Sequence, residues 1–424
     1  MVSYVVAGAE GDLSARLHAH QDDGVKWCRF GAETIFWRSA GPGGRWPPDL
    51  RNLTVEPKKA LGELYLVVQV GNSFLDEFPD SRVIVNKGRY LAVDLTSHEI
   101  ARIHDHGHTC FGMKPLPECS AAIMTLTPTR RERDPALATL VSGLSRAKLA
   151  ATLSQLTAFR TRHSLSAEFS SAAASMKSEF EALGYTVSKM PISVGSGSSF
   201  NVVAERAGEG SNRKLVVATA HLDSVNLAGG SAAAAPGADD NGSGSAGLVE
   251  IARIMAGQRH QHDLRLILFG GEEQGLLGSR QYVAALGQSD RDRLDSAINM
   301  DMIGSVNMQP LTVMLEGAAV SQALIDDLAD AAHDYTTLTV QTSLNPFASD
   351  HVPFIDAGLP CLLTIEGADS ANHNIHSAGD TLDKINIDLM NEILKMNVVV
   401  MARRLEVAAA VSARSSSSPV VSWG

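Results

Sequence analysis

The chain has 424 residues, of which 44% are hydrophobic and 20% are charged, and its formal net charge at pH 7 is -11. A chain of this length exceeds what one hydrophobic core usually serves, so two domains are expected. The acidic balance and the lack of a dense Lys/Arg run argue against a nucleic-acid partner, and every apolar run is far shorter than the roughly 20 residues that a membrane span needs.

Residues 1–125 are predicted to form a small α+β domain of short strands, turns and one helix. The helix begins at a capping box, because the hydroxyl of Thr96 can accept the backbone N–H of Glu99 while the Glu99 side chain reaches back to the N–H of Thr96. Residues 126–143 combine several prolines with a basic cluster. We interpret them as a linker to a larger domain.

Residues 144–411 alternate between predicted helices and strands. The predicted strands are nearly continuous apolar runs, which is typical of a sheet that helices cover on both faces. The alternation therefore predicts an α/β fold with a mixed central sheet, parallel in its middle. The strands are expected at 185–192, 199–205, 213–220, 264–270, 297–302, 311–315 and 361–365, and the main helices at 144–162, 166–183, 243–257, 276–286, 319–334 and 387–410. The serine-rich tail, 412–424, is expected to be disordered.

Ligand-type side chains follow the carboxyl ends of several predicted strands. In a covered α/β sheet, the loops at those ends converge on one rim, where ligands bind. Each side chain alone has an ordinary explanation, such as a satisfied core histidine or a solvated pair of glutamates. Four separate strand ends would, however, have to acquire such residues by coincidence. We therefore interpret the set as a metal site, formed by His221, Asp240, Glu273, Asp301 and His376 with Glu272 beside them.

The residue types select the metal. Imidazoles and carboxylates without cysteine favour zinc, with cobalt or manganese as less favoured alternatives, over calcium or magnesium, which prefer oxygen-only shells. Five ligands exceed what one catalytic zinc needs, whereas two Zn²⁺ ions that share a carboxylate would each receive three. Adjacent residues of an extended segment project oppositely, so Glu272 can face the bridging water as general base while Glu273 holds a metal. Asp223 can accept the proton on the far ring nitrogen of His221.

At these residues the sequence resembles the dizinc aminopeptidase family, the bacterial leucyl aminopeptidases that are related to glutamate carboxypeptidase, the transferrin receptor and glutaminyl cyclase. The resemblance implies the zinc exopeptidase fold and a cis peptide bond between Asp239 and Asp240. Ile375 departs from the family pattern, because some members carry a tyrosine there that is thought to stabilise the tetrahedral intermediate. The matching motifs lie at 221–224, 236–244, 269–279, 299–304, 349–351 and 375–381.

The resemblance also assigns roles to the candidate ligands. It implies that His221 and Asp301 hold one zinc ion, that Glu273 and His376 hold the other, and that Asp240 bridges the two. Glu272 is implied as the base and Asp223 as the residue that orients His221.

We predict a zinc-dependent aminopeptidase that hydrolyses the N-terminal peptide bond of peptides or proteins through a metal-bridging hydroxide, with a preference for apolar N-terminal residues. Two alternatives stay open: a glutaminyl cyclase-like enzyme, and a catalytically silent receptor or binding module on the same fold. Residues 1–125 resemble a propeptide, so we expect them to act as an intramolecular chaperone or inhibitor. No signal peptide is visible. The habit of the family favours an extracellular or periplasmic location, with a cytoplasmic one as the alternative.

Overall fold

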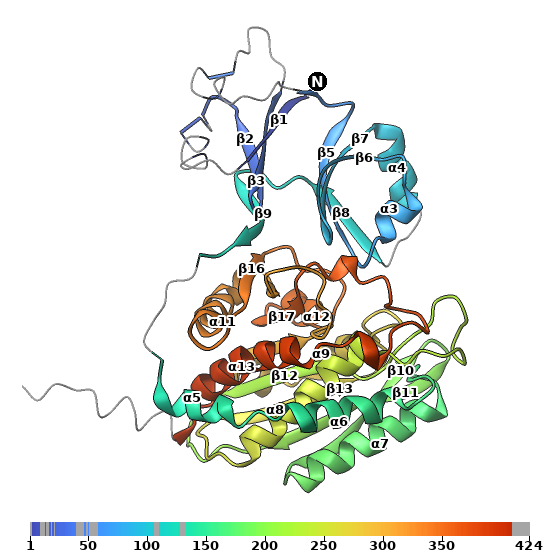
Figure 1. Ribbon diagram of the computed structural model, residues 1–424, viewed down its shortest axis with the longest axis vertical. Coiled ribbons are helices and arrows are strands. Elements are labelled where there is room, and N and C mark those ends of the chain that lie inside the picture. Colours follow the sequence, from blue (N-terminus) through green and yellow to red (C-terminus); the bar gives the residue numbers. More distant parts are fainter. Residues whose placement is uncertain are drawn as a thin grey trace, which may run out of the picture. The chain divides into compact units, whose positions relative to one another are not determined.

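The computed structural model describes residues 2–8, 13, 17, 19–20, 22–39, 46–47, 50, 58–105, 110–127 and 133–408 (Figure 1). The chain divides into two compact units. Unit 1 contains Met1–Leu126 together with Gln341–Ala348 and Ala368–His373, and unit 2 contains Thr127–Val340, Ser349–Gly367 and Asn374–Gly424. Two short segments of the stretch expected to form the large domain therefore fold with the N-terminal residues. The predicted tail, 412–424, lies outside the described residues.

Unit 1 contains two groups of paired strands. In the first, the order is β9-β2-β3-β1-β4, with β1 (Val2–Gly8), β2 (Lys26–Phe30), β3 (Glu33–Ser39), β4 (Lys58–Lys59) and β9 (Ser120–Thr125). In the second, the order is β6-β7-β5-β8, with β5 (Glu63–Gln69), β6 (Arg82–Lys87), β7 (Tyr90–Leu95) and β8 (Phe111–Pro115). Helices α3 (Ser73–Glu77) and α4 (Ser97–Asp105) pack against the second sheet (Figure 1).

The predicted capping box of α4 is confirmed. The backbone N–H of Thr96 donates to Glu99 Oε2 at 2.7 Å, and the N–H of Glu99 donates to Thr96 Oγ1 at 3.3 Å. These bonds satisfy backbone donors that the first helical turn leaves without partners. On its inner side, α4 places Ile103 in a buried cluster with Phe74 and Leu91. Local sequence signals and core packing therefore agree on this helix.

Unit 2 contains the predicted mixed sheet, with the strand order β10-β11-β13-β12-β14-β17-β15. Strand β16, next to β15 in the order, begins in unit 2 and ends in unit 1. The middle pairs β12–β13, β12–β14 and β14–β17 are parallel, whereas β10–β11, β11–β13 and β15–β17 are antiparallel. The prediction of a mixed sheet with a parallel middle is thus confirmed. The strands are β10 (Thr186–Val194), β11 (Gly197–Arg206), β12 (Leu215–His221), β13 (Asp263–Phe269), β14 (Leu294–Met300), β15 (Thr312–Glu316), β16 (Thr339–Ser343) and β17 (Cys361–Glu366).

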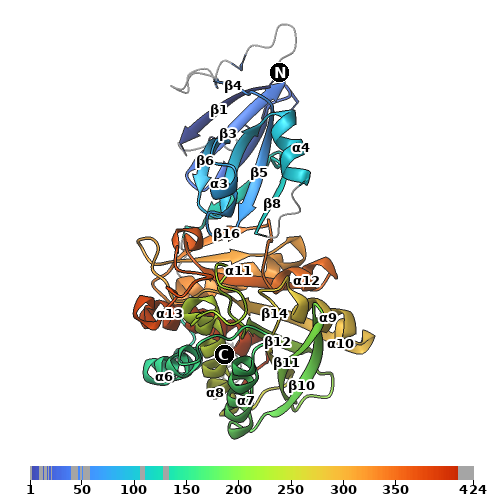
Figure 2. The same ribbon diagram turned by 90° about the vertical axis from the view of Figure 1, so that its right-hand side faces the viewer.

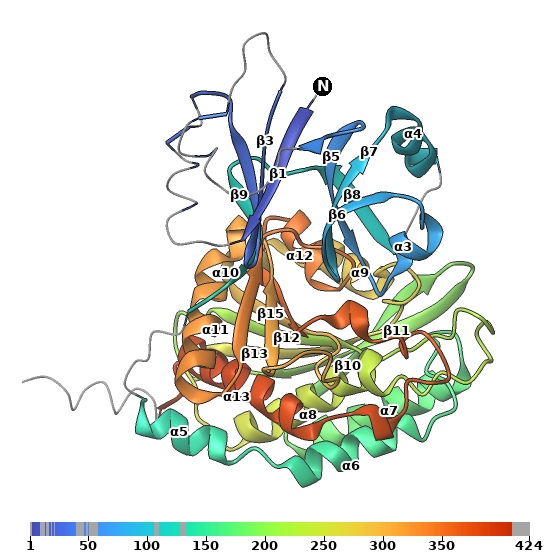
Figure 3. The same ribbon diagram turned by 45° about the horizontal axis from the view of Figure 1, so that its top comes forward.

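Helices cover both faces of this sheet (Figure 2). One face carries α6 (Arg146–Thr157), α7 (Ala167–Ala182), α8 (Gly244–Ala256) and α13 (Ile387–Arg404), and the other carries α9 (Leu277–Ala285), α10 (Gln288–Arg293) and α12 (His351–Asp356). Helix α11 (Gln322–Tyr335) packs beside α13 (Figure 3). The side chains of Phe169, Met176 and Phe180, along one side of α7, are fully buried. None of the helices in the described ranges has the length and apolarity that crossing a bilayer requires.

The stretch interpreted as a linker, 126–143, contains a helix, α5 (Pro135–Ser142). The side chain of Asp134 accepts the backbone N–H of Ala136 at 2.8 Å, and Pro135 occupies the first helical position. An N-cap aspartate followed by proline is a helix-start signal, since proline has no N–H to lose there. The prolines of this stretch suggested a linker, but in this position proline favours a helix.

The parallel strands end together and so position the functional side chains. In the register, His221 at the end of β12 stands opposite Phe269 at the end of β13. On the other side of β12, Thr219 is paired with Asn299 of β14. Residues that follow β12, β13 and β14 therefore emerge at one edge of the sheet.

Candidate metal centre

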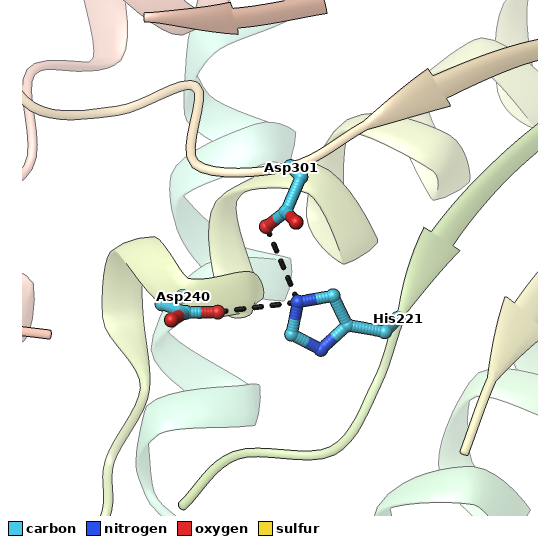
Figure 4. Close-up of side chains that lie close together, drawn as sticks. All are labelled: His221, Asp240 and Asp301. Atoms are coloured by element: carbon cyan, nitrogen blue, oxygen red, sulfur yellow. Dashed lines mark hydrogen bonds and ion pairs between the residues drawn. The ribbon is translucent and has the colours of Figure 1, made fainter. Parts of the chain in front are cut away.

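The first group of candidate ligands joins the ends of two strands to the segment that precedes α8 (Figure 4). His221 is the last residue of β12, Asp301 directly follows β14, and Asp240 lies in the segment Ala238–Ser243, where its backbone is non-helical, with φ of -105° and ψ of 94°. The Nε2 atom of His221 lies 3.1 Å from Asp240 Oδ1 and 3.2 Å from Asp301 Oδ1. All three residues are buried.

The second group uses the other oxygen of the same aspartate. The Nε2 atom of His376 lies 3.0 Å from Asp240 Oδ2 and 3.1 Å from Glu273 Oε2. In each group, one ligand atom per residue lies within 4.8 Å of the others. The five predicted ligands are therefore brought together as two sets of three donors with Asp240 in common.

The donors in both groups fit a divalent metal ion. Each group combines one imidazole with two carboxylates, and three protein donors are what a catalytic zinc site with an open position uses. Glu273 Oε1 is buried and has no hydrogen-bond partner among the residues that the structure describes. A buried carboxylate oxygen without a partner is costly, and a cation beside it would satisfy it.

The protonation behaviour of these residues reflects crowded negative charge. Burial lowers the pKa of His221, but the charge of Asp301 and other nearby carboxylates outweighs burial and raises it well above the usual histidine value. The pKa of His376 is raised well above its usual value in the same way, mainly by Glu273. Burial, reinforced by the charge of Asp240, raises the pKa of Glu273 to about 7. Without cations, the centre thus retains protons to offset its carboxylates.

Glu272 and Asp223 lie beside the two groups and not within them. Burial raises the pKa of Glu272 well above the usual glutamate value; nearby carboxylates add to the rise, and His221 opposes it. Asp223 lies behind His221, with its carboxylate 3.6 Å and its backbone carbonyl oxygen 3.2 Å from His221 Nδ1. The same carboxylate accepts the backbone N–H groups of Glu272, at 3.4 Å, and Glu273, at 3.3 Å. Asp223 thus connects a candidate ligand to the segment that carries the candidate base.

Two glycines let the chain turn between β13 and Glu272. Gly271 has φ of 70°, in the left-handed region that favours glycine. A Cβ atom on Gly270 would lie 2.8 Å from the ring of Phe169 and 2.9 Å from the carbonyl oxygen of Phe200. Side chains are therefore excluded at the turn that brings Glu272 to the rim.

Arg162 was not predicted, although it ties together the two segments that carry His221 and Asp240. It is completely buried, and its guanidinium donates to the carbonyl oxygens of Leu222 at 2.7 Å and Gly237 at 2.8 Å, and also to those of Leu156 and Pro236. Burial lowers its pKa to about 10, so the group stays charged at neutral pH. Because its partners are backbone carbonyls, no side-chain motif in the sequence points to it.

Asp380 lies within the motif at 375–381, where the sequence assigned it no role, and it holds the backbone at Asp240. Its two carboxylate oxygens accept the N–H groups of Asp239 and Asp240, each at 2.9 Å. The cis peptide implied between these two residues is wrong, because the cis bond is the next one, Asp240–Asn241. Asp239 Oδ1 accepts the N–H of Gly304 at 2.8 Å and belongs to neither donor group.

A chain of side chains leads from β12 to Asp301. The hydroxyl of Thr219 donates to Asn299 Oδ1 at 2.7 Å, Asn299 Nδ2 donates to Ser349 Oγ at 2.8 Å, and Ser349 Oγ donates to Asp301 Oδ2 at 2.7 Å. All four residues are buried. Asp301 Oδ2 is thus fixed by a hydroxyl while Oδ1 faces His221.

Comparison with known sequences agrees with this geometry. Residues 201–401 match the model of Peptidase family M28. The chain is 31% identical over 199 residues to leupeptin-inactivating enzyme 1 of Streptomyces exfoliatus, covering 46% of this chain and 42% of that one. It is 31% identical over 202 residues to leucine aminopeptidase 1 of Fusarium vanettenii, and this match covers 45% of this chain and 51% of that one. The chain thus spans about half the length of the curated relatives it matches.

Solved structures share the fold. BSAP, a zinc aminopeptidase from Bacillus subtilis, aligns with a TM-score of 0.55 at 17% identity and covers 62% of this chain and 95% of its own. The LapA aminopeptidase of Legionella pneumophila aligns with a TM-score of 0.58 at 18% identity, and the alignment covers 82% of this chain and 99% of the LapA chain. At these identities, the likeness supports the predicted zinc exopeptidase architecture and says nothing about substrate.

Proposed function

We propose that the chain is a member of peptidase family M28, whose model residues 201–401 match, and that it is a zinc-dependent aminopeptidase that hydrolyses the N-terminal peptide bond of peptides or proteins. The observation that carries the proposal is the position of Asp240, whose two carboxylate oxygens lie 3.1 Å and 3.0 Å from different histidine nitrogens. A relative named leucine aminopeptidase supports a preference for apolar N-terminal residues.

In the proposed metal centre, each of the two donor groups would hold one zinc ion. His221 and Asp301 would hold one ion, Glu273 and His376 would hold the other, and Asp240 would be shared between them. The bonds that fix these ligands from behind support the arrangement, since metal-ligating side chains usually need such partners. Asp223 and Ser349 are the partners for His221 and Asp301.

When bound, the zinc ions would polarise the scissile carbonyl and lower the pKa of the attacking water. Glu272 takes the proton of that water on its carboxylate and then passes it to the nitrogen of the leaving amine. Asp223 keeps the segment of Glu272 in place through the two backbone N–H groups that it accepts. The carboxylates around the rim attract the positively charged α-amino group of a peptide N-terminus.

The test compares Glu272→Ala and Glu272→Gln with wild-type protein, using zinc content and a panel of aminoacyl anilides. Because Glu272 lies outside both donor groups, the variants should keep their zinc while turnover falls by about 10²–10⁴-fold, the usual contribution of a general base. Glu209→Ala, which removes an exposed partner of Arg259, is the control and should keep full activity. Unchanged turnover in the Glu272 variants would contradict the mechanism. Cyclisation of an N-terminal glutamine substrate without anilide hydrolysis would indicate the cyclase alternative.

A further inference from the structure

Arg89 connects the two short segments that join unit 1 from within the later part of the chain. It lies between β6 and β7, where its carbonyl oxygen accepts the N–H of Gln69 at 2.8 Å, and it is 3% exposed. One guanidinium nitrogen lies 3.2 Å from Asp369 Oδ2 in a buried ion pair, and the other donates to the carbonyl oxygen of Phe347 at 2.5 Å. One side chain thus binds Gln341–Ala348 and Ala368–His373 together.

Further contacts within unit 1 hold the first of these segments. Gln341 pairs with Thr125 of β9 in an antiparallel ladder. The hydroxyl of Ser343 and the amide of Asn345 both donate to the carbonyl oxygen of Ala122, at 2.7 Å and 3.2 Å. The N-terminal residues therefore supply part of this segment's backbone pairing as well as the Arg89 donor to the carbonyl oxygen of Phe347.

Two glycines of the N-terminal residues make room for the same segments. A Cβ atom on Gly112 would lie 2.8 Å from the ring of Phe347, and one on Gly88 would lie 2.1 Å from Ser370 Oγ. A Cβ atom at either position would force the side chain of Phe347 or Ser370 to move. Both segments are thus packed closely against residues from the N-terminal part of the chain.

Each segment continues directly into the proposed metal centre. Gln341–Ala348 is followed by Ser349, which donates to Asp301 at 2.7 Å. Ala368–His373 is followed within three residues by His376. Displacement of the first segment would move Ser349, whose hydrogen bond holds Asp301, and displacement of the second would be passed along the backbone to His376.

We propose that Arg89 is a positioning residue for the aminopeptidase proposed above, on which this inference rests, and that residues 1–126 are a permanent part of the working enzyme. The N-terminal residues hold the two segments that lead to Asp301 and His376. This role differs from that of the removable chaperone or inhibitor expected from the sequence. Arginine suits it because its planar guanidinium can bind a carboxylate and a carbonyl at once, whereas the single ammonium of lysine is a point charge.

The first test compares Arg89→Met and Arg89→Lys with Arg82→Gln. Arg82 forms an ion pair with Asp94 in the same unit, and Asp94 keeps two backbone N–H donors when Arg82 is replaced, so this variant perturbs unit 1 away from the two segments. Three quantities are measured: zinc affinity by chelator competition, kcat and KM on an aminoacyl anilide, and amide hydrogen exchange over 343–348 and 369–372.

Arg89→Met should speed exchange in both segments, weaken zinc binding about tenfold, as loss of a supporting partner does, and lower kcat more than it raises KM. Arg89→Lys should fall between Arg89→Met and wild type, and Arg82→Gln should match wild type. Zinc affinity and kcat/KM within twofold of wild type in Arg89→Met, or equal losses in Arg82→Gln, would overturn the proposal. If wild-type protein hydrolyses no anilide, the proposed function fails, while zinc affinity and exchange still decide the role of Arg89.

A second experiment needs no Arg89 variant and decides the matter if Arg89→Met does not fold. A specific protease site is placed within residues 128–132 of the full chain, and the cleaved protein is passed over a size-exclusion column. The N-terminal fragment should remain bound, with zinc affinity and activity unchanged. Release of the fragment from a chain that keeps its full zinc affinity would refute a permanent role for residues 1–126.

Discussion

Replacing Arg162 with methionine should destabilise the metal-free protein by about 3–5 kcal/mol, the usual cost of removing one partner from a buried charged network. The guanidinium is fully buried and donates to four carbonyl oxygens. Each carbonyl oxygen that loses its hydrogen-bond donor costs about 1–3 kcal/mol, so the cost summed over the four oxygens would exceed the expected loss of about 3–5 kcal/mol. Part of this cost is offset because the variant no longer buries a charged group. A chain with a stability of about 5–15 kcal/mol should therefore remain folded.

Stability of the metal-free chain is the better readout, because two effects on zinc affinity oppose each other. Loosening the segments that carry His221 and Asp240 would weaken zinc binding, while removing a positive charge near the carboxylates would strengthen it. Urea unfolding in the presence of a chelator isolates the structural effect. Arg206→Met is the matched control, since Arg206 donates to two carbonyl oxygens at the far end of α8 and is partly exposed. A loss in Arg162→Met below about 1 kcal/mol, or below that in Arg206→Met, would refute the reasoning.

Two further predictions follow from the carboxylates around the centre. Asp380→Asn would place an amide N–H donor against the backbone N–H donors of Asp239 and Asp240. Zinc affinity, measured by chelator competition, should therefore fall about 10–100-fold. The control is Asp383→Asn at an exposed position, which should leave zinc affinity unchanged. Burial raises the pKa of Glu273 and of Asp380 to about 7 in the folded protein, whereas the unfolded values are about 4. The protonated carboxyls therefore stabilise the folded state fully below pH about 4, and this stabilisation is lost as the pH rises through about 7. The melting temperature of the chelated protein should therefore fall between pH 5 and pH 8, and zinc should reduce that fall; a rise without zinc would contradict the assignment.

The sheet and the positions of the candidate ligands could be predicted because their signals are local. A histidine or carboxylate directly after an apolar strand, as at His221 and Asp301, needs only the rule that parallel strands end at one edge. The supporting residues could not be predicted in this way. Arg162 and Asp380 act on backbone carbonyl and N–H groups, which every residue possesses, so side-chain patterns do not reveal them. The two segments that join unit 1 depend on pairing between residues such as Thr125 and Gln341, which are far apart in sequence.

The composition of unit 1 from three separate stretches of chain has a consequence for biosynthesis. Its last stretch, Ala368–His373, is made only after most of unit 2. Domains generally fold as units, the N-terminal one first, as the chain leaves the ribosome. Here the first domain to emerge must wait for residues about 240 positions downstream of Leu126 before its strands and ion pairs are complete. During translation, the N-terminal residues therefore expose the edge of β9 and the charge of Arg89 until the partners of both have been synthesised.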